Sequence, residues 1–301
     1  MRSLTKNLFN ELKNGKLHTL LEYVQNDDTL DMEFRNNYIT IYYRGGNIIS
    51  VTESKNNDDS YSYTWEGINK DYLKGYKQKH EDAEQFEEYI PEAKHIIDRY
   101  ICKIKNHLGE KEIQQLIVRE NNYSPNSQDT DYFIVDMEYE QNNSRFDLIA
   151  LRWDSNRSAR NNNKVSLAVI EIKQGYKSVR TSKKTPGLKS HQDDFNKFKQ
   201  TLSETKNDFL KNDFLQIFKQ KCELGLILAN EKIEGIKQDS VLELDDDIDF
   251  ICLLANYKKA SDNLHNELEE MEKKSCKFIR SHYMGYGLYA DEIFTLTSEN
   301  I

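Results

Sequence analysis

Three charged residues lie inside apolar segments that have the composition of buried strands, where an unpaired charge is costly. Asp147 interrupts the segment 145–151, and Glu171 and Lys173 interrupt the segment 165–173. Because side chains alternate between the two faces of a strand, we expect Glu171 and Lys173 on the same face. If the two segments pair in one sheet, Asp147 lies beside Glu171.

Two carboxylates and an ammonium group at one place suit the binding of a hard divalent cation. Mg²⁺ in proteins is held by one or two carboxylates and completes its coordination with water and phosphate oxygens. Such a cation lowers the pKa of a bound water and neutralises charge on a scissile phosphate. Lys173 would orient or deprotonate that water and stabilise the transition state. The simpler interpretation is a buried ion-pair network of Asp147, Glu171 and Lys173 with a structural role only.

The spacing of these residues resembles the core motif of the PD-(D/E)XK nuclease superfamily. Asp147 is followed after about 24 residues by Glu171-Ile172-Lys173 at the end of an apolar segment, and Phe146 stands where the family has proline. The resemblance implies a restriction-endonuclease-like core, a mixed central sheet flanked by helices, that hydrolyses phosphodiester bonds with Mg²⁺ or Mn²⁺. Asp147, Glu171 and the Ile172 carbonyl would hold the metal, and Lys173 would act on the water and the phosphate.

The resemblance extends to the helices on either side of this motif and covers residues 110–256. The family's leading helix often supplies a glutamate, and Glu112 matches that position best, with Glu110 and Glu120 as competitors. The helix after the motif contributes a further polar residue, for which Gln192 is the candidate alongside His191 and Asp194. An ordinary helix-surface position is the alternative for Glu112 and for Gln192.

A basic segment follows the motif, although the chain as a whole has a formal net charge of −9. From Ile172 to Gln192 there is no acidic residue, and the basic residues there are Lys173, Lys177, Arg180, Lys183, Lys184 and Lys189. The five that follow Lys173 are candidates for contacts with the phosphates of a nucleic acid. A flexible basic loop that only keeps the protein in solution is the alternative.

The pattern of apolar residues predicts an α/β protein with an N-terminal α+β accessory domain, 1–78, and a second domain, 79–301, which the resemblance implies to be nuclease-like. In the first domain we expect helices within 4–26, a hairpin of 38–44 and 47–52 that turns at Gly45-Gly46, and a strand at 61–65. In the second we expect helices at 79–108, 110–119, 188–220 and about 260–280, and strands at 132–139, 145–151, 165–173, 223–229 and 249–255. The near-continuous apolar strands indicate a sheet covered by helices on both faces. Asp136 and Glu138 alternate with apolar residues, which favours solvent-facing positions on an outer strand.

The sequence argues against a membrane-spanning protein and against a secreted one. No stretch approaches the roughly 18 to 20 apolar residues of a membrane-spanning helix, and the first thirty residues lack a secretory signal. The four cysteines are far apart, which favours reduced thiols in a cytoplasmic protein.

The function predicted from the sequence is that of a Mg²⁺-dependent deoxyribonuclease, either an endonuclease or an exonuclease. A nucleic-acid-binding module that does not cut, and a structural or interaction protein with a buried Asp/Glu/Lys cluster, are the alternatives. The choice between DNA and RNA and the oligomeric state, a homo-oligomer included, stay open.

Overall fold

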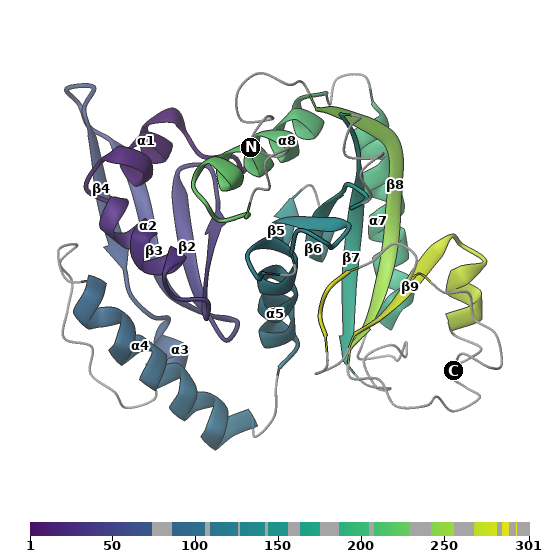
Figure 1. The fold of residues 1–301 in the computed structure, drawn as a ribbon, viewed down its shortest axis with the longest axis horizontal. Coiled ribbons are helices and arrows are strands. Elements are labelled where there is room, and N and C mark those ends of the chain that lie inside the picture. The colour runs from purple at the N-terminus through teal and green to yellow at the C-terminus, as the bar shows by residue number, and fades with distance from the viewer. Residues whose placement is uncertain are drawn as a thin grey trace.

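The structure is a computed structural model in which two sheets lie side by side (Figure 1). It describes residues 1–73, 86–105, 109–125, 127–141, 144–155, 163–174, 187–204, 208–228, 242–255, 268–281, 285–288 and 293. The first sheet has four strands in the order β1-β2-β3-β4, and the second has five in the order β5-β6-β7-β8-β9. The predicted mixed α/β class is confirmed.

The N-terminal sheet is an antiparallel meander packed against helices. Its elements are α1 (Lys6–Asn14), α2 (His18–Gln25), β1 (Leu30–Phe34), β2 (Tyr38–Tyr43), β3 (Gly46–Lys55), β4 (Tyr61–Glu66), α3 (Lys70–Leu73) and α4 (Phe86–Tyr100). Helix α1 begins after Thr5, whose hydroxyl accepts a hydrogen bond from the Leu8 amide at 3.1 Å. The predicted N-terminal helices and hairpin are confirmed, whereas β1 was not predicted.

The turn between β2 and β3 lies one residue earlier than the sequence suggests. Tyr43 pairs with Gly46, so the two turn residues are Arg44 and Gly45, with φ of 49° and 73°. This is the sign of φ that a two-residue hairpin requires at both positions. A Cβ atom at Gly45 would lie 2.5 Å from the carbonyl carbon of Lys111, which explains why glycine is needed at this close approach.

Helix α4 packs on the N-terminal sheet. The Trp65 ring on β4 contacts the rings of Phe86 and Tyr89, with centroids 5.3 Å and 4.9 Å apart. A short π-helical turn, Ile101–Lys105, continues α4. Packing therefore groups α4 with β1–β4, although the predicted boundary after residue 78 assigned this segment to the second domain.

The second sheet is mixed. Its elements are α5 (Glu110–Asn122), β5 (Tyr132–Gln141), β6 (Ser144–Arg152), β7 (Lys164–Gln174), α7 (Gly187–Ser203), α8 (Asp208–Glu223), β8 (Glu243–Ala255) and β9 (Cys276–Ser281). Strands β5, β6 and β7 are antiparallel neighbours, whereas β7, β8 and β9 run parallel. Ile113 of α5 shares an apolar cluster with Ile170 on one face, and Phe195 of α7 stacks on Phe250 on the other. The prediction of helices on both faces is confirmed.

One predicted element in the C-terminal half is wrong, and another is confirmed in part. The residues expected to be helical over 188–220 form α7 and α8, and residues 205–207 between them lie outside the described part. The apolar run 223–229 does not form a strand over its described residues, which end at 228. Instead Gly225, with φ of 66°, follows the end of α8, and the Leu226 amide donates to the Lys221 carbonyl at 2.8 Å. The described part of the run is therefore the turn after α8, in which Leu224, Leu226 and Ile227 are buried.

The helix expected at about 260–280 is also wrong in its second half. Residues 268–272 are helical, but Cys276–Ser281 form β9, which pairs with β8. The first part of the prediction, 260–267, lies outside the described residues.

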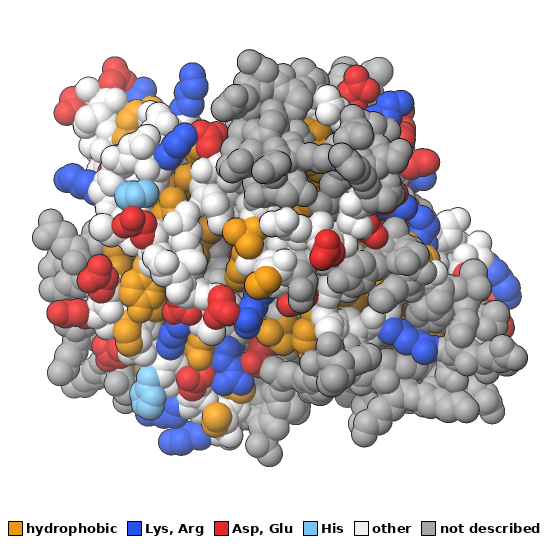
Figure 2. Space-filling model, viewed as in Figure 1, with side chains coloured by type: hydrophobic (Ala, Val, Ile, Leu, Met, Phe, Trp, Pro, Cys, Tyr) orange, Lys and Arg blue, Asp and Glu red, His pale blue; other side chains and the backbone are white. Residues whose placement is uncertain are grey.

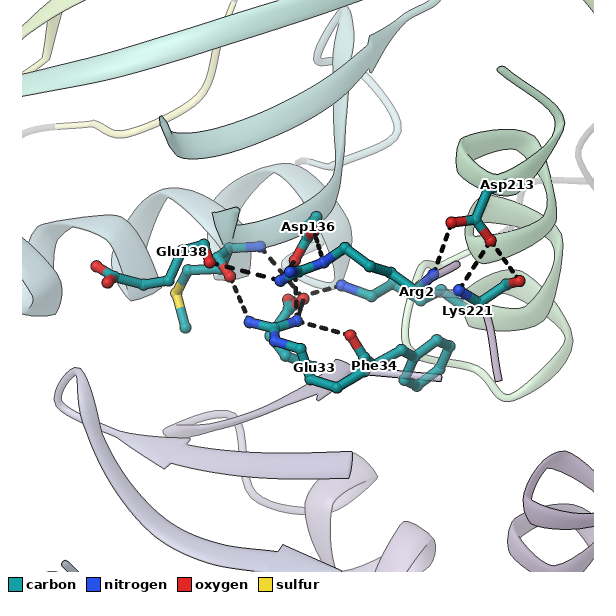
Figure 3. Close-up of polar contacts among 10 residues, drawn as sticks. Arg2, Glu33, Phe34, Asp136, Glu138, Asp213 and Lys221 are labelled. Carbon is teal, nitrogen blue, oxygen red and sulfur yellow. Dashed lines mark hydrogen bonds and ion pairs between the residues drawn. The ribbon is translucent and has the colours of Figure 1, made fainter. Parts of the chain in front are cut away.

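Buried charged side chains join the two sheets (Figure 3). We call this group the interface cluster: Arg2, Glu33, Arg35, Asp136 and Lys221. Asp136 forms ion pairs with Arg2 and, at 2.9 Å, with Arg35, and Lys221 Nζ lies 2.7 Å from Glu33 Oε1. The solvent-facing position predicted for Asp136 is wrong, because its side chain is 1% exposed. Glu138, which shared that prediction, is half-buried.

The first residues of the chain are tied to α8. The amides of Arg2 and Ser3 donate to the Asp213 carboxylate at 2.6 Å and 3.0 Å. The side chain of Gln220 both accepts from the Leu4 amide and donates to the Leu4 carbonyl. The N-terminal segment is thus hydrogen-bonded to a helix of the second sheet.

All four cysteines are free thiols, and Cys102 is the exposed one. No helix in the described part of the chain has the length and apolar character needed to cross a membrane.

Candidate functional site

Asp147 lies where the hydrogen-bond ladder between β6 and β7 ends. The last paired residues in this direction are Leu148 and Ile170. Beyond them, the Asp147 carboxylate accepts a hydrogen bond from the Ile172 amide at 2.7 Å. Its second oxygen accepts from Gln114 Nε2 at 2.8 Å. The side chain of Asp147 therefore replaces backbone pairing and is held between β7 and α5.

Glu171 and Lys173 lie on the same face of β7, as predicted. Lys173 Nζ lies 3.2 Å from Glu171 Oε2. The residues are 1% and 7% exposed, so the pair is buried in the central strand of the sheet. The structure thus brings Asp147, Glu171 and Lys173 into one cluster, as expected from antiparallel pairing of β6 and β7.

The negative charges of this cluster favour a positively charged group within it. Burial, and next the negative charge of Glu171, raise the pKa of Asp147 well above its ordinary value. Burial alone would lower the pKa of Lys173, but the charges of Glu171, Asp147 and Glu110 outweigh it and raise that pKa. Lys173 is consequently a stable ammonium group, suited to stabilising negative charge.

Helix α5 contributes Glu110 and Gln114 to this cluster. Glu110 Oε1 lies 3.9 Å from Lys173 Nζ, whereas Glu112 accepts a hydrogen bond from Arg44 Nε at 2.7 Å on the side of the N-terminal sheet. The structure therefore brings the competing residue Glu110, and not Glu112, toward Lys173. Gln114 was not predicted, although its spacing of four from Glu110 places both on one face of a helix.

Helix α7 contributes His191. Its Nδ1 atom lies 3.2 Å from Glu171 Oε1. The predicted residue Gln192 is 3% exposed, and its side chain donates to Asn196 Oδ1 at 3.4 Å. No hydrogen bond joins Gln192 to Glu171 among the described residues, and its proposed role stays a prediction.

Most of the predicted phosphate-binding residues lie outside the described residues. These are Lys177, Arg180, Lys183 and Lys184. Lys189 is described and is exposed on α7. On the face shown in Figure 2, the described basic side chains are interspersed with acidic ones.

The available donor atoms fit a hard divalent cation in type. Glu171 Oε1 and Glu110 Oε1 are buried, and neither accepts a hydrogen bond from a described residue. Carboxylate oxygens are the ligands that Mg²⁺ and Mn²⁺ prefer. A preformed set of three or more His, Cys, Asp or Glu ligands is absent from the described part of the chain. A cation would therefore depend on the free oxygens of Glu171 and Glu110 and on the remaining lone pairs of Asp147, whose two oxygens each accept one hydrogen bond already, with water and substrate as further ligands.

No protein-family model, curated protein or solved structure matches the chain, so a functional assignment depends on the geometry of Asp147, Glu171 and Lys173.

Proposed function

We propose that the chain is a Mg²⁺- or Mn²⁺-dependent nuclease that hydrolyses phosphodiester bonds in DNA, with a PD-(D/E)XK site on a restriction-endonuclease-like core. The observation that carries the proposal is the convergence of Asp147, Glu171 and Lys173 where β6 and β7 stop pairing. Glu171 and Lys173 are buried and Asp147 is half-buried at the end of a strand pair, although charged groups are costly to bury. A catalytic role accounts for keeping them there.

The arrangement of elements supports the same proposal. Helix α5 precedes the antiparallel strands β5, β6 and β7, and α7 follows β7 before the parallel strand β8. The resemblance of the sequence implies a leading helix and a following helix that both supply polar residues. Glu110 and Gln114 of α5 and His191 of α7 are such residues.

Asp147, Glu171 and the Ile172 carbonyl would hold the metal in this proposal. When bound, a divalent cation supplies an activated water and neutralises charge on the phosphate. Gln114 fixes the orientation of Asp147 through its hydrogen bond of 2.8 Å. Lys173, held as an ammonium group beside Glu171, stabilises the negative charge that develops on the phosphate oxygens.

Cleavage of labelled DNA tests the proposal. The full chain is incubated with duplex DNA, single-stranded DNA and RNA, in the presence of Mg²⁺, Mn²⁺ or a chelator. We expect cleavage of DNA that requires the metal and that falls about 10²-fold or more in Asp147→Asn, Glu171→Gln and Lys173→Met, since each removes a charge that acts on the transition state. Circular dichroism confirms that each variant is folded.

Asp193→Asn is the matched control, because this carboxylate is exposed on α7 next to Gln192. It should cleave at the rate of the unmodified chain. Salt-dependent binding of DNA without turnover in either metal would favour the non-catalytic nucleic-acid-binding alternative. Absence of both binding and cleavage would favour a purely structural ion-pair cluster.

A further inference from the structure

A pocket of about 550 Å³ lies between the N-terminal sheet, α4 and α5, and we call it the α5 pocket. Its volume is in the range of small-molecule sites. Charged residues of its wall are Asp28, Arg44, Asp98, Glu112 and Arg119, and Tyr43, Cys102 and Leu116 also line it.

The α5 pocket and the Asp147 cluster lie on opposite faces of α5. Each residue of a helix is rotated by about 100° from the one before it. Glu112 and Arg119 line the pocket, whereas Glu110 and Gln114 contact Lys173 and Asp147. The pocket is thus separate from the proposed nuclease site.

Both arginines of the α5 pocket are already paired with carboxylates of its wall. Arg44 donates to Glu112 Oε1 at 2.7 Å and to Asp98 Oδ1 at 2.8 Å. Arg119 donates to Asp28 Oδ2 at 2.6 Å. Because all five of these side chains line the pocket, the three carboxylates exceed the two guanidinium groups and leave the wall negative.

Arg44 has a backbone conformation that is unfavourable for a residue with a side chain. Its φ of 49° is in the left-handed region, which a residue with a Cβ atom adopts only at a cost. Asn or Gly is the usual residue at this position of a two-residue turn. An arginine here holds Glu112 and Asp98 in place at the pocket wall.

Glu112 has an acceptor atom that the arrangement leaves unused. The residue is 8% exposed, and its Oε2 atom is buried without a hydrogen-bond partner among the described residues. A buried polar atom without a hydrogen-bond partner destabilises the folded state. A ligand that donates a hydrogen bond to this oxygen would recover that lost free energy.

We propose that the α5 pocket binds a small organic cation whose N–H groups donate to Glu112 Oε2. Its apolar part would pack against Tyr43 and Leu116, which also line the pocket. An anion would meet two arginines that are already neutralised and three carboxylates that repel it. The negative wall and the unused acceptor therefore both select for positive charge.

Three ligands of nearly the same shape test the sign of the charge: benzamidine is a cation, benzamide is neutral and benzoate is an anion. Binding to the full chain is measured by calorimetry. The rate at which iodoacetamide alkylates Cys102 gives a second readout, because Cys102 lines the pocket and is the exposed cysteine. We expect benzamidine to bind at millimolar concentration and to slow alkylation, and we expect the other two ligands to bind at least about tenfold more weakly, a difference of 1.4 kcal/mol or more.

Glu112→Gln should weaken benzamidine binding at least about tenfold, 1.4 kcal/mol or more. Leu116→Trp, which fills the pocket from its half-buried position, should do the same without changing a charge. Glu140→Gln, an exposed carboxylate on β5, is the control and should bind normally. Equal binding of benzamide, tighter binding of benzoate, unchanged binding by Glu112→Gln, or no binding of benzamidine would each overturn the proposal. None of these measurements depends on nuclease activity.

Discussion

The substitution Asp31→Asn should raise the free energy of unfolding, and the gain should increase as the pH rises toward neutrality. Asp31 is 4% exposed on β1, and its Oδ2 atom has no hydrogen-bond partner among the described residues. Burial, and next the charge of Glu33, raise the pKa of Asp31 from 3.8 to about 7, although Lys221 and Arg35 act in the opposite direction. Asp31 therefore adds an acidic group to the edge of the interface cluster that ionises only at a cost.

The pKa shift sets the size of the effect. Between pH 3.8 and about 7 the folded state holds the Asp31 proton and the unfolded state has lost it. Stability therefore falls as the pH rises through this window and is constant above it. A shift from 3.8 to about 7 corresponds to roughly 4 kcal/mol at pH values above 7, since one pKa unit is about 1.36 kcal/mol.

Urea denaturation of the unmodified chain and of Asp31→Asn, at about pH 5 and about pH 8, measures this difference. The free energy of unfolding of the variant, relative to the unmodified chain, should rise by roughly 2 to 3 kcal/mol between these two pH values, because only the part of the window from about pH 5 to about 7 lies between them. Asp58→Asn is the control, because Asp58 is exposed and hydrogen bonds from Ser60 lower its pKa. Its relative stability should not change over the same range.

The reasoning would be refuted by an Asp31→Asn difference that is independent of pH, or by one that falls as the pH rises. Either result would mean that the Asp31 carboxylate is ionised in the folded state at pH 5 without cost. Because the variant is compared with the unmodified chain at each pH, the pH-dependent contributions of the other acidic residues to the free energy of unfolding cancel.

Two further predictions concern the buried polar contacts. Lys221→Met should lower the free energy of unfolding by up to about 3 to 5 kcal/mol, because the buried Glu33 carboxylate loses its closer cation and keeps only Arg35, 3.7 Å away. Lys219→Met, half-buried on the same helix, should cost much less, and equal losses in urea denaturation would contradict the assignment. Gln114→Ala should weaken Mg²⁺ binding or DNA cleavage by about 10- to 100-fold, because Asp147 loses the donor that orients it. Gln200→Ala, exposed on α7, is its control in the calorimetric and cleavage assays, and unchanged values for Gln114→Ala would show that Asp147 needs no such support.

Local patterns were sufficient to predict the central part of the second sheet. The alternation of β7 places Glu171 beside Lys173, and the apolar character of the strand requires cover on both faces. Both properties follow from residues that are close in sequence. The α/β class was predicted for the same reason, whereas the pairing of β6 with β7 was the condition on which the position of Asp147 beside Glu171 depended.

The errors arise where a distant partner decides the structure. Asp136 has the sequence pattern of a solvent-facing residue and is buried because Arg2 and Arg35 reach it from the N-terminal segment and from the end of β1. Matching of the sequence favoured Glu112, but the structure turns Glu112 toward Arg44 and Glu110 toward Lys173. The run 223–229 has the composition of a strand, but its described part forms the turn after α8.

The bonds between the first residues and α8 place a condition on folding during synthesis. The ribosome releases Arg2 and Ser3 early, whereas their acceptor, Asp213, emerges only after most of the chain has been made. Glu33 must wait longer still for Lys221. Although N-terminal segments generally fold first during translation, the N-terminal sheet of this chain cannot complete its buried polar contacts until α8 has left the exit tunnel.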